Sequence, residues 1–229
     1  MFGFNFKLDD FQQEAINHIE EGKSVVVCAP TGAGKTCIAQ SAIHLALEKG
    51  DRIFYTTPLK ALSNQKYNDF SKLYGQELVG LLTGDTTINR SAPIVVMTTE
   101  VFRNMLYGTT FGSIKDNLAN VKYVVLDEVH YMNDESRGTV WEESIIYCPT
   151  NIQLIALSAT VKNSKQLTDW INTVHSKTEL VYTDFRPVPL RFFYYDSSKP
   201  NTILPLLTPS GALNSKIRPE SNISTKKKR

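Results

Sequence analysis

The amino-acid sequence predicts an α/β fold built on a mostly parallel sheet with helices on both faces. Short apolar runs alternate along the chain with longer segments of helical periodicity, which is the pattern of repeated strand-helix-strand units. The most apolar runs, 25–28 and 121–126, lack polar alternation, as expected of strands buried on both faces. Apolar residues make up 41% of the 229 residues, which is enough for one sizeable core.

Each predicted element has a local reason. The strands are short β-branched and apolar runs, and the helices repeat apolar residues every three or four positions. Pro58 favours the start of the second helix, because proline is tolerated in a first helical turn. The third helix has its apolar face at Val140, Trp141, Ser144 and Ile145. In chain order, strands are expected at 25–28, 52–57, 78–82, 94–98, 121–126, 152–157 and 179–183, and helices at 35–49, 59–73, 135–147 and 163–174.

The composition changes near residue 186, which predicts three parts. Residues 1–185 form the α/β domain, and the run Arg186-Pro-Val-Pro-Leu190 leaves it as extended chain because its two prolines restrict the backbone. This exit segment covers 186–198 and contains a candidate edge strand at 191–196. Residues 199–229 are rich in Ser, Pro, Asn and Lys and are expected to be disordered. They carry 7 basic and 1 acidic residue, against 18 basic and 22 acidic residues before them.

The composition also excludes several classes of protein. No apolar run reaches the roughly 18 residues of a membrane-spanning helix, and the N-terminus lacks the basic and apolar regions of a secretory signal. The three cysteines, Cys28, Cys37 and Cys148, are odd in number and lack the spacing of a zinc site. We therefore expect a soluble intracellular protein in a reducing compartment. With a formal charge of only +2, nucleic acid would bind in a local groove.

The segment 29–36 follows a predicted strand and opens a predicted helix, which is the context of a Walker A phosphate loop with Ala as its first residue. Gly32 and Gly34 let backbone N–H groups turn inward around a phosphate, and the helix N-terminus adds the positive end of its dipole. Lys35 is placed to reach the outer phosphates of ATP, and the Thr36 hydroxyl to hold Mg²⁺. The cofactor-binding residues expected in this loop are Ala29, Pro30, Thr31, Gly32, Ala33, Gly34, Lys35 and Thr36.

Two adjacent carboxylates, Asp127 and Glu128, end the apolar run 121–126. Asp127 suits the outer coordination of nucleotide-bound Mg²⁺, and Glu128 suits the general base that activates an attacking water. A solvated acidic strand end is the alternative, but the Walker A sequence upstream favours the functional interpretation. Glu128, Asp127 and Lys35 are therefore the predicted catalytic residues.

Together these residues resemble the motifs of a superfamily-2 DExH-box helicase. The run Asp127-Glu-Val-His130 is similar to motif II, and Ser158-Ala-Thr160 to motif III. Segments 58–65, 83–85 and 98–100 are similar to motif Ia, the strand-end motif after it and motif Ib. The implied fold is a RecA-like P-loop NTPase domain.

A more specific resemblance lies in the run 134–143. It resembles the Ski-like branch, which contains RNA helicases of exosome-associated type and their cyanobacterial and plastid relatives. The exit segment continues this likeness, and the run 203–207 leans toward the cyanobacterial and plastid relatives. The whole resemblance covers residues 4–207 and leaves nucleus, cytoplasm and plastid open as compartments.

The resemblance also implies roles for residues outside the phosphate loop. Gln12 belongs to an adenine-recognition segment and has the donor and acceptor that an adenine edge requires; an exposed position on an amphipathic helix is its alternative. His130, Ser158 and Thr160 are expected to couple nucleotide state to domain movement. Single-stranded RNA is expected to lie across the carboxyl ends of the strands and to bind through its backbone, without sequence specificity. The expected RNA-binding residues are Pro58, Lys60, Asn64, Gln65, Gly84, Thr98, Thr99 and Arg103.

One part of the helicase pattern does not occur in these 229 residues. In the family, a Q-x-x-G-R-x-G-R run in a second RecA-like domain completes the ATP site. We therefore expect an N-terminal motor domain that binds ATP, Mg²⁺ and RNA but has no arginine on the nucleotide side, and that needs a second RecA-like domain for turnover. Two alternatives stay open: a free-standing module that binds nucleotide or RNA without catalysis, and a subunit of a split helicase that pairs in trans.

Overall fold

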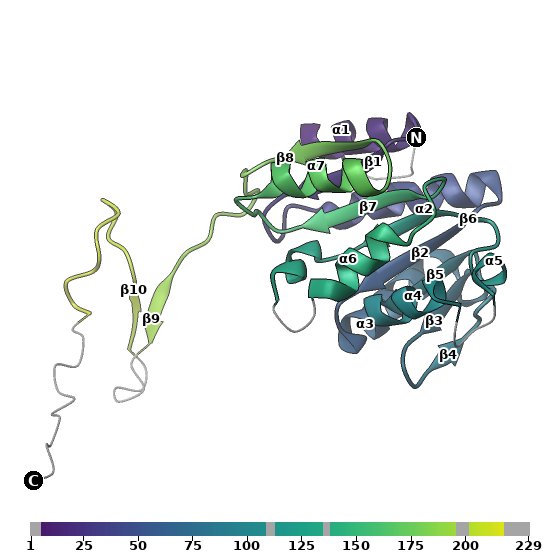
Figure 1. Ribbon diagram of the computed structural model, residues 1–229. Coiled ribbons are helices and arrows are strands. Elements are labelled where there is room, and N and C mark those ends of the chain that lie inside the picture. Colours follow the sequence, from purple (N-terminus) through teal and green to yellow (C-terminus); the bar gives the residue numbers. More distant parts are fainter. Residues whose placement is uncertain (1–5, 109–112, 135–137, 196–201, 218–229) are drawn as a thin grey trace, which may run out of the picture. The chain divides into compact units, whose positions relative to one another are not determined.

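The computed structural model describes residues 6–108, 113–134, 138–195 and 202–217 (Figure 1). Contacts between residues divide the chain into two compact units, Met1–Arg186 and Pro187–Arg229. Within the described ranges, no helix is both long enough and apolar enough to cross a membrane.

The first unit contains an eight-stranded sheet with the spatial order β4-β3-β5-β2-β6-β7-β1-β8. All neighbouring strands are parallel except β3 and β4, which are antiparallel at one edge. The central strands are fully buried apolar runs, which explains the missing polar alternation in the sequence. The strands are β1 (Ser24–Cys28), β2 (Arg52–Thr57), β3 (Val79–Leu82), β4 (Thr87–Ile88), β5 (Ile94–Thr98), β6 (Val121–Leu126), β7 (Gln153–Ser158) and β8 (Thr178–Tyr182).

Helices cover both faces of this sheet, as the sequence predicts, and the sheet separates two apolar cores (Figure 1). One core lies under α1, α2 and α3, and the other lies under α4, α6 and α7. The helices are α1 (Asp10–Glu20), α2 (Lys35–Lys49), α3 (Lys60–Tyr74), α4 (Thr99–Leu106), α5 (Ile114–Asn117), α6 (Gly138–Ile146) and α7 (Ser164–Val174), with 3₁₀ turns η1 (Gln76–Leu78) and η2 (Val129–Asn133).

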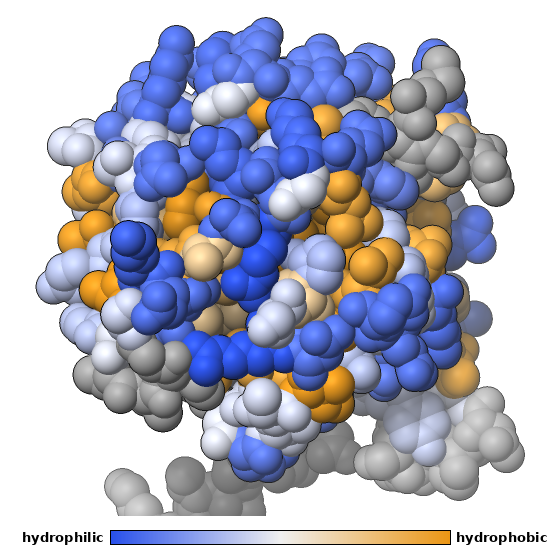
Figure 2. All heavy atoms as spheres, turned by 90° about the vertical axis from the view of Figure 1, so that its right-hand side faces the viewer, coloured by the Kyte–Doolittle hydropathy of each residue, from blue (hydrophilic) through white to orange (hydrophobic). Residues whose placement is uncertain are grey.

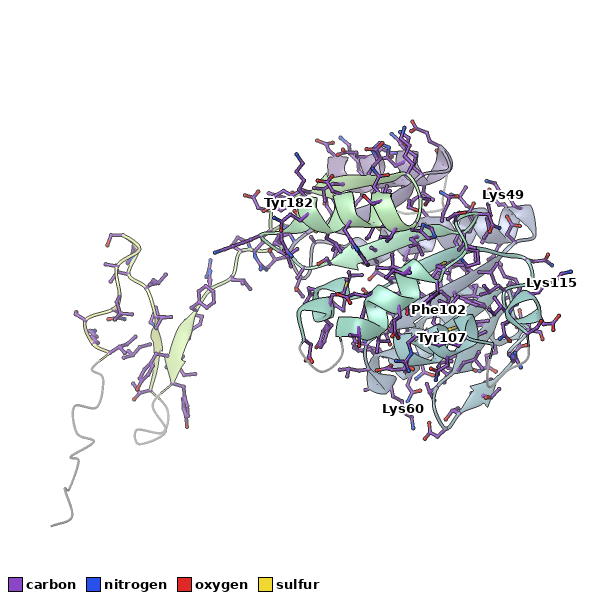
Figure 3. All side chains as sticks on the ribbon, viewed as in Figure 1. Lys49, Lys60, Phe102, Tyr107, Lys115 and Tyr182 are labelled. Carbon is purple, nitrogen blue, oxygen red and sulfur yellow. The ribbon has the colours of Figure 1, made fainter. Side chains whose placement is uncertain are left out.

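The two ends of the parallel strands differ in character. Lys49 and Lys115 lie toward the side where strands begin, whereas Lys60 and Tyr182 lie toward the side where they end (Figure 3). Hydrophilic side chains cover much of the face where strands begin, with apolar side chains interspersed among them (Figure 2). The phosphate loop and the two adjacent carboxylates follow strand ends, so they share the other side.

The second unit differs from the expectation for the chain after residue 186. The strand expected at 191–196 forms as β9 (Phe193–Tyr195), but it pairs antiparallel with β10 (Ile203–Pro205) and does not join the large sheet. β10 lies inside the segment for which composition predicts disorder. Its cross-strand pairs, Tyr195 with Ile203, Tyr194 with Leu204 and Phe193 with Pro205, place apolar residues opposite one another, which favours this ladder.

Candidate nucleotide and nucleic-acid site

The segment 29–34 forms a tight loop between β1 and α2, as the sequence predicts. Gly32 and Gly34 have φ values of 84° and 83°, in the left-handed region that favours glycine. A Cβ on Gly34 would lie 2.7 Å from Nε2 of Gln12, so a side chain there would force the Gln12 amide to shift. The loop therefore places its backbone against the N-terminus of α2, where N–H groups lack helical partners and favour an anion.

The side chain of Lys35 lies inside the curve of this loop. Its ammonium donates to the carbonyl oxygens of Ala29 at 2.8 Å and Pro30 at 3.2 Å. Burial lowers the pKa of Lys35, while the charges of Glu128 and Asp127 act in the opposite direction. The structure thus brings the three predicted catalytic residues into one electrostatic environment, although they are some 90 positions apart in the sequence.

Gln12 is buried, which contradicts the alternative of an exposed position on the helix surface. Its amide oxygen accepts a hydrogen bond from the backbone N–H of Asp9 at 2.9 Å, and its nitrogen donates to the carbonyl of Ala33 at 3.2 Å. In this arrangement Gln12 ties α1 to the phosphate loop. Upstream of it, Phe6 is exposed, and Phe4 lies outside the described residues.

Asp127 is held in place by a residue that the sequence analysis does not single out. The buried Tyr55 hydroxyl donates to Oδ2 of Asp127 at 2.6 Å, and the backbone N–H of Glu128 donates to Oδ1 at 3.0 Å. Burial, together with the charge of Asp127, raises the pKa of Tyr55 well above its ordinary value, so Tyr55 remains a donor. Carboxylate and hydroxyl oxygens are ligands that Mg²⁺ prefers, so Asp127 and Thr36 suit that ion.

Glu128 has a left-handed backbone, with φ 56° and ψ 43°. This conformation is uncommon for a residue with a side chain. It ends the extended course of β6 abruptly and starts the 3₁₀ turn η2 at the next residue. The side chain of Glu128 is half-buried, and its Oε2 lies 3.3 Å from Nδ1 of His130.

The contact between motifs II and III differs from the expected one. The backbone N–H of Ala159 donates to Nδ1 of His130 at 3.4 Å, so the main chain makes this link. Ser158 Oγ is buried without an oxygen or nitrogen partner among the described residues, and Thr160 is exposed. Among the described residues, neither the Ser158 nor the Thr160 side chain forms a hydrogen bond with the 127–130 loop.

The residues expected to bind RNA separate into exposed and buried groups. Lys60, Gln65 and Gly84 are exposed, and Asn64 is half-buried. Thr99 is fully buried, and its hydroxyl donates to the carbonyl of Thr57 at 3.1 Å, so its side chain joins two strand ends. Pro58 and Thr98 are also buried, and Thr98 is the N-cap of α4 without a capping bond from its side chain.

Both candidate RNA-binding cations have carboxylate partners. Lys60 forms an ion pair with Asp85, and Arg103 lies 3.5 Å from Oε2 of Glu143. A phosphate group that binds at either position must therefore compete with a carboxylate. Both residues lie on the side where the strands end, but each of the two charges is paired with a carboxylate.

Two cations near the phosphate loop have no assigned role in the sequence analysis. Arg186 donates through Nη1 to the carbonyl of Thr31 at 3.4 Å, and its charge contributes to the lowered pKa of Lys35. Lys66 donates to Oγ1 of Thr36 at 3.2 Å. Arg186 therefore lies beside the phosphate loop, a position that the sequence does not predict. Its proximity to the loop has no local sequence signal, because 155 positions separate Arg186 from Thr31.

Replacing Tyr55 by Phe is expected to destabilise the domain by about 1–2 kcal/mol, because a buried hydroxyl that donates to a carboxylate is lost. Urea unfolding followed by circular dichroism measures this change. Tyr182→Phe is the control: Tyr182 is exposed, and its substitution should change stability by less than about 0.5 kcal/mol. Equal unfolding midpoints for the two variants would contradict a stabilising bond between Tyr55 and Asp127.

A phosphate loop between the parallel strand β1 and a helix, with two carboxylates after β6, two strands away in the same sheet, defines a P-loop NTPase domain. Residues 9–168 match the DEAD/DEAH box helicase family. The chain belongs to this family.

Similar proteins support the same assignment. The chain is 53% identical over 209 residues to the chloroplastic DExH-box ATP-dependent RNA helicase DExH15 of Arabidopsis thaliana, covering 91% of this chain. It is 46% identical over 193 residues to the human exosome RNA helicase MTR4, covering 84% of this chain. The chain spans only 18% of the length of each of these relatives.

A solved structure agrees with the fold. The structure of Mycobacterium smegmatis helicase Lhr bound to ssDNA and AMP-PNP superposes with a TM-score of 0.60 and 26% sequence identity. The match covers 75% of this chain and 25% of that one. Together with the relatives, it confirms the predicted resemblance to DExH-box helicases and the RecA-like α/β fold.

Proposed function

We propose that this chain is the first RecA-like motor domain of an ATP-dependent RNA helicase. In this function it binds ATP·Mg²⁺ at the phosphate loop and single-stranded RNA across the carboxyl ends of the strands. The observation that carries the proposal is the position of Lys35 inside the loop, under the electrostatic influence of Asp127 and Glu128. The ATP-dependent RNA helicases among its relatives support this choice of nucleotide and nucleic acid.

Each residue of the nucleotide site has a separate task. The loop N–H groups and the ammonium of Lys35 bind the phosphates, which requires Lys35 to exchange its contacts with Ala29 and Pro30 for phosphate oxygens. Asp127 and the Thr36 hydroxyl would hold Mg²⁺, which supplies charge neutralisation to the phosphates. Glu128 orients the attacking water and accepts its proton.

Turnover in this proposal depends on a second RecA-like domain, in the same polypeptide or in trans. That domain contributes arginine to the transferring phosphoryl group, where charge develops. The contact between Ala159 and His130 gives the first domain a link from motif II to the end of β7, through which nucleotide state is passed on.

RNA binding by the isolated chain is expected to be salt-sensitive and independent of sequence. Because Lys60 and Arg103 already have carboxylate partners, few phosphates can be neutralised, and the log–log slope of affinity against salt should be about −2 to −4. Fluorescence anisotropy with labelled oligo(U) and a mixed-sequence RNA over a salt series measures it.

Deleting residues 222–229 tests where the relevant cations lie. This segment contains Lys226, Lys227, Lys228 and Arg229. If binding persists with a slope within about one unit of the full chain's value, the strand-end residues contribute. Complete loss of binding after the deletion would contradict the proposed RNA site.

A further inference from the structure

Lys66 occupies the side of the nucleotide site at which magnesium is expected. It is a half-buried residue of α3, and its Nζ donates to Oγ1 of Thr36 at 3.2 Å. The same ammonium lies 5.6 Å from the centre of the Tyr55 ring. The hydroxyl of that ring donates to Asp127. Lys66 therefore contacts one proposed magnesium ligand directly, and it lies against the ring that positions the other.

A magnesium ion and the ammonium of Lys66 cannot both use these positions. Mg²⁺ binds oxygen at about 2.0–2.1 Å and tolerates little distortion of its octahedral geometry. An ammonium that stays within hydrogen-bond distance of Thr36 Oγ1 would bring a unit charge within a few ångströms of a divalent cation, where repulsion is strong. Binding of the metal to Thr36 must then displace Lys66 from it.

The present contacts of Lys66 are favourable, so displacement has a cost. A half-buried ammonium gains from the hydroxyl of Thr36 and from the face of the Tyr55 ring. The ring that it contacts carries the hydroxyl that donates to Asp127, so the ammonium is linked to that carboxylate through Tyr55. When no metal is bound, the ammonium of Lys66 thus occupies this side of the site.

We propose that Lys66 is a positioning residue that competes with Mg²⁺ and so sets the magnesium concentration at which nucleotide binds productively. The proposal rests on the proposed ATP·Mg²⁺ site. Lys66 neither takes part in the chemistry nor contacts the nucleotide in this role. Removing its charge while keeping most of its length is therefore expected to strengthen metal binding rather than weaken it.

The experiment compares Lys66→Met with Lys66→Arg and with Lys72→Met, a matched control in which an exposed lysine of the same helix is changed. A fluorescent ADP analogue at fixed concentration is titrated with MgCl₂, and binding of Mn²⁺ to the ADP complex is followed by electron paramagnetic resonance. We expect the half-saturating metal concentration to fall about five- to tenfold in Lys66→Met. It should stay within about twofold of wild type in Lys66→Arg, which keeps the charge, and in Lys72→Met.

The outcomes separate this inference from the function on which it rests. An unchanged or raised half-saturating metal concentration in Lys66→Met would overturn the inference. Lys66 would then have no effect on metal binding, or it would help to bind the nucleotide. A wild-type chain that binds no nucleotide at any magnesium concentration would overturn the proposed function itself. Thermal unfolding of each variant in EDTA establishes that the comparison is between folded proteins.

Discussion

The rate of ATP hydrolysis by residues 1–229 alone is expected to be about 10³- to 10⁵-fold lower than the rate of the same chain supplied with a second RecA-like domain. The reason is the charge that develops on the transferring phosphoryl group, which an arginine from outside the phosphate loop stabilises. A coupled assay of phosphate release, with and without oligo(U), measures the difference. The second domain is supplied by fusion after Leu190 or added in trans.

Arg186 is a candidate source of this charge within residues 1–229, so the prediction also tests whether Arg186 can supply it. Its guanidinium donates to the carbonyl of Thr31, so one arginine of the first unit itself lies beside the phosphate loop. A purified chain that turns over at about 1 s⁻¹, a rate typical of complete enzymes, and loses this activity in Glu128→Gln would contradict the requirement for a second domain. Loss of that activity in Arg186→Ala would identify Arg186 as the source of the charge.

Lys35→Ala is expected to abolish detectable binding of ATP·Mg²⁺. Lys35 lies inside the loop, and the substitution leaves the outer phosphates without this ammonium while the carboxylates of Asp127 and Glu128 remain. Isothermal titration calorimetry measures the affinity. Lys49→Ala, at the far end of the same helix, is the control and should bind like wild type.

The fold of Lys35→Ala should be retained, because burial lowers the pKa of Lys35, so its charged form costs more in the folded chain than in the unfolded one. An unfolding midpoint at or above that of wild type would agree with this interpretation. Unchanged affinity for ATP·Mg²⁺ in a folded Lys35→Ala variant would contradict the assignment of the phosphate loop.

The parallel sheet was predictable because most of its strands are short apolar runs that can be recognised from neighbouring residues alone. Runs such as residues 25–28 are apolar on both faces, because they are buried between two helical layers. The short strand β4, Thr87–Ile88, is exposed and contains two residues, so no periodicity marks it. A helix at α1 is expected only in the alternative that places Gln12 on an exposed helix surface, although the apolar residues Phe11, Ala15 and Ile19 recur with helical periodicity.

The site was predictable only as far as its motifs are contiguous. The phosphate loop and the pair Asp127 and Glu128 are each one short run, so their chemistry can be inferred without knowing the fold. Tyr55 has no such signal, because it lies within an apolar strand and meets Asp127 only through the pairing of β2 with β6. Side-chain partners of this kind depend on long-range packing, which no local sequence pattern specifies.

The left-handed backbone at Glu128 affects which substitutions at this position the folded chain tolerates. A residue with a side chain costs on the order of 1–3 kcal/mol in such a conformation, whereas glycine adopts it freely. Substitutions that remove the carboxylate and relieve the backbone therefore carry no penalty from folding, and quality control that detects unfolded protein does not eliminate them. Only the loss of activity does. Glu128 is thus kept against the preference of the local backbone, which makes it a sensitive indicator of whether natural variants of this domain remain under selection as motors.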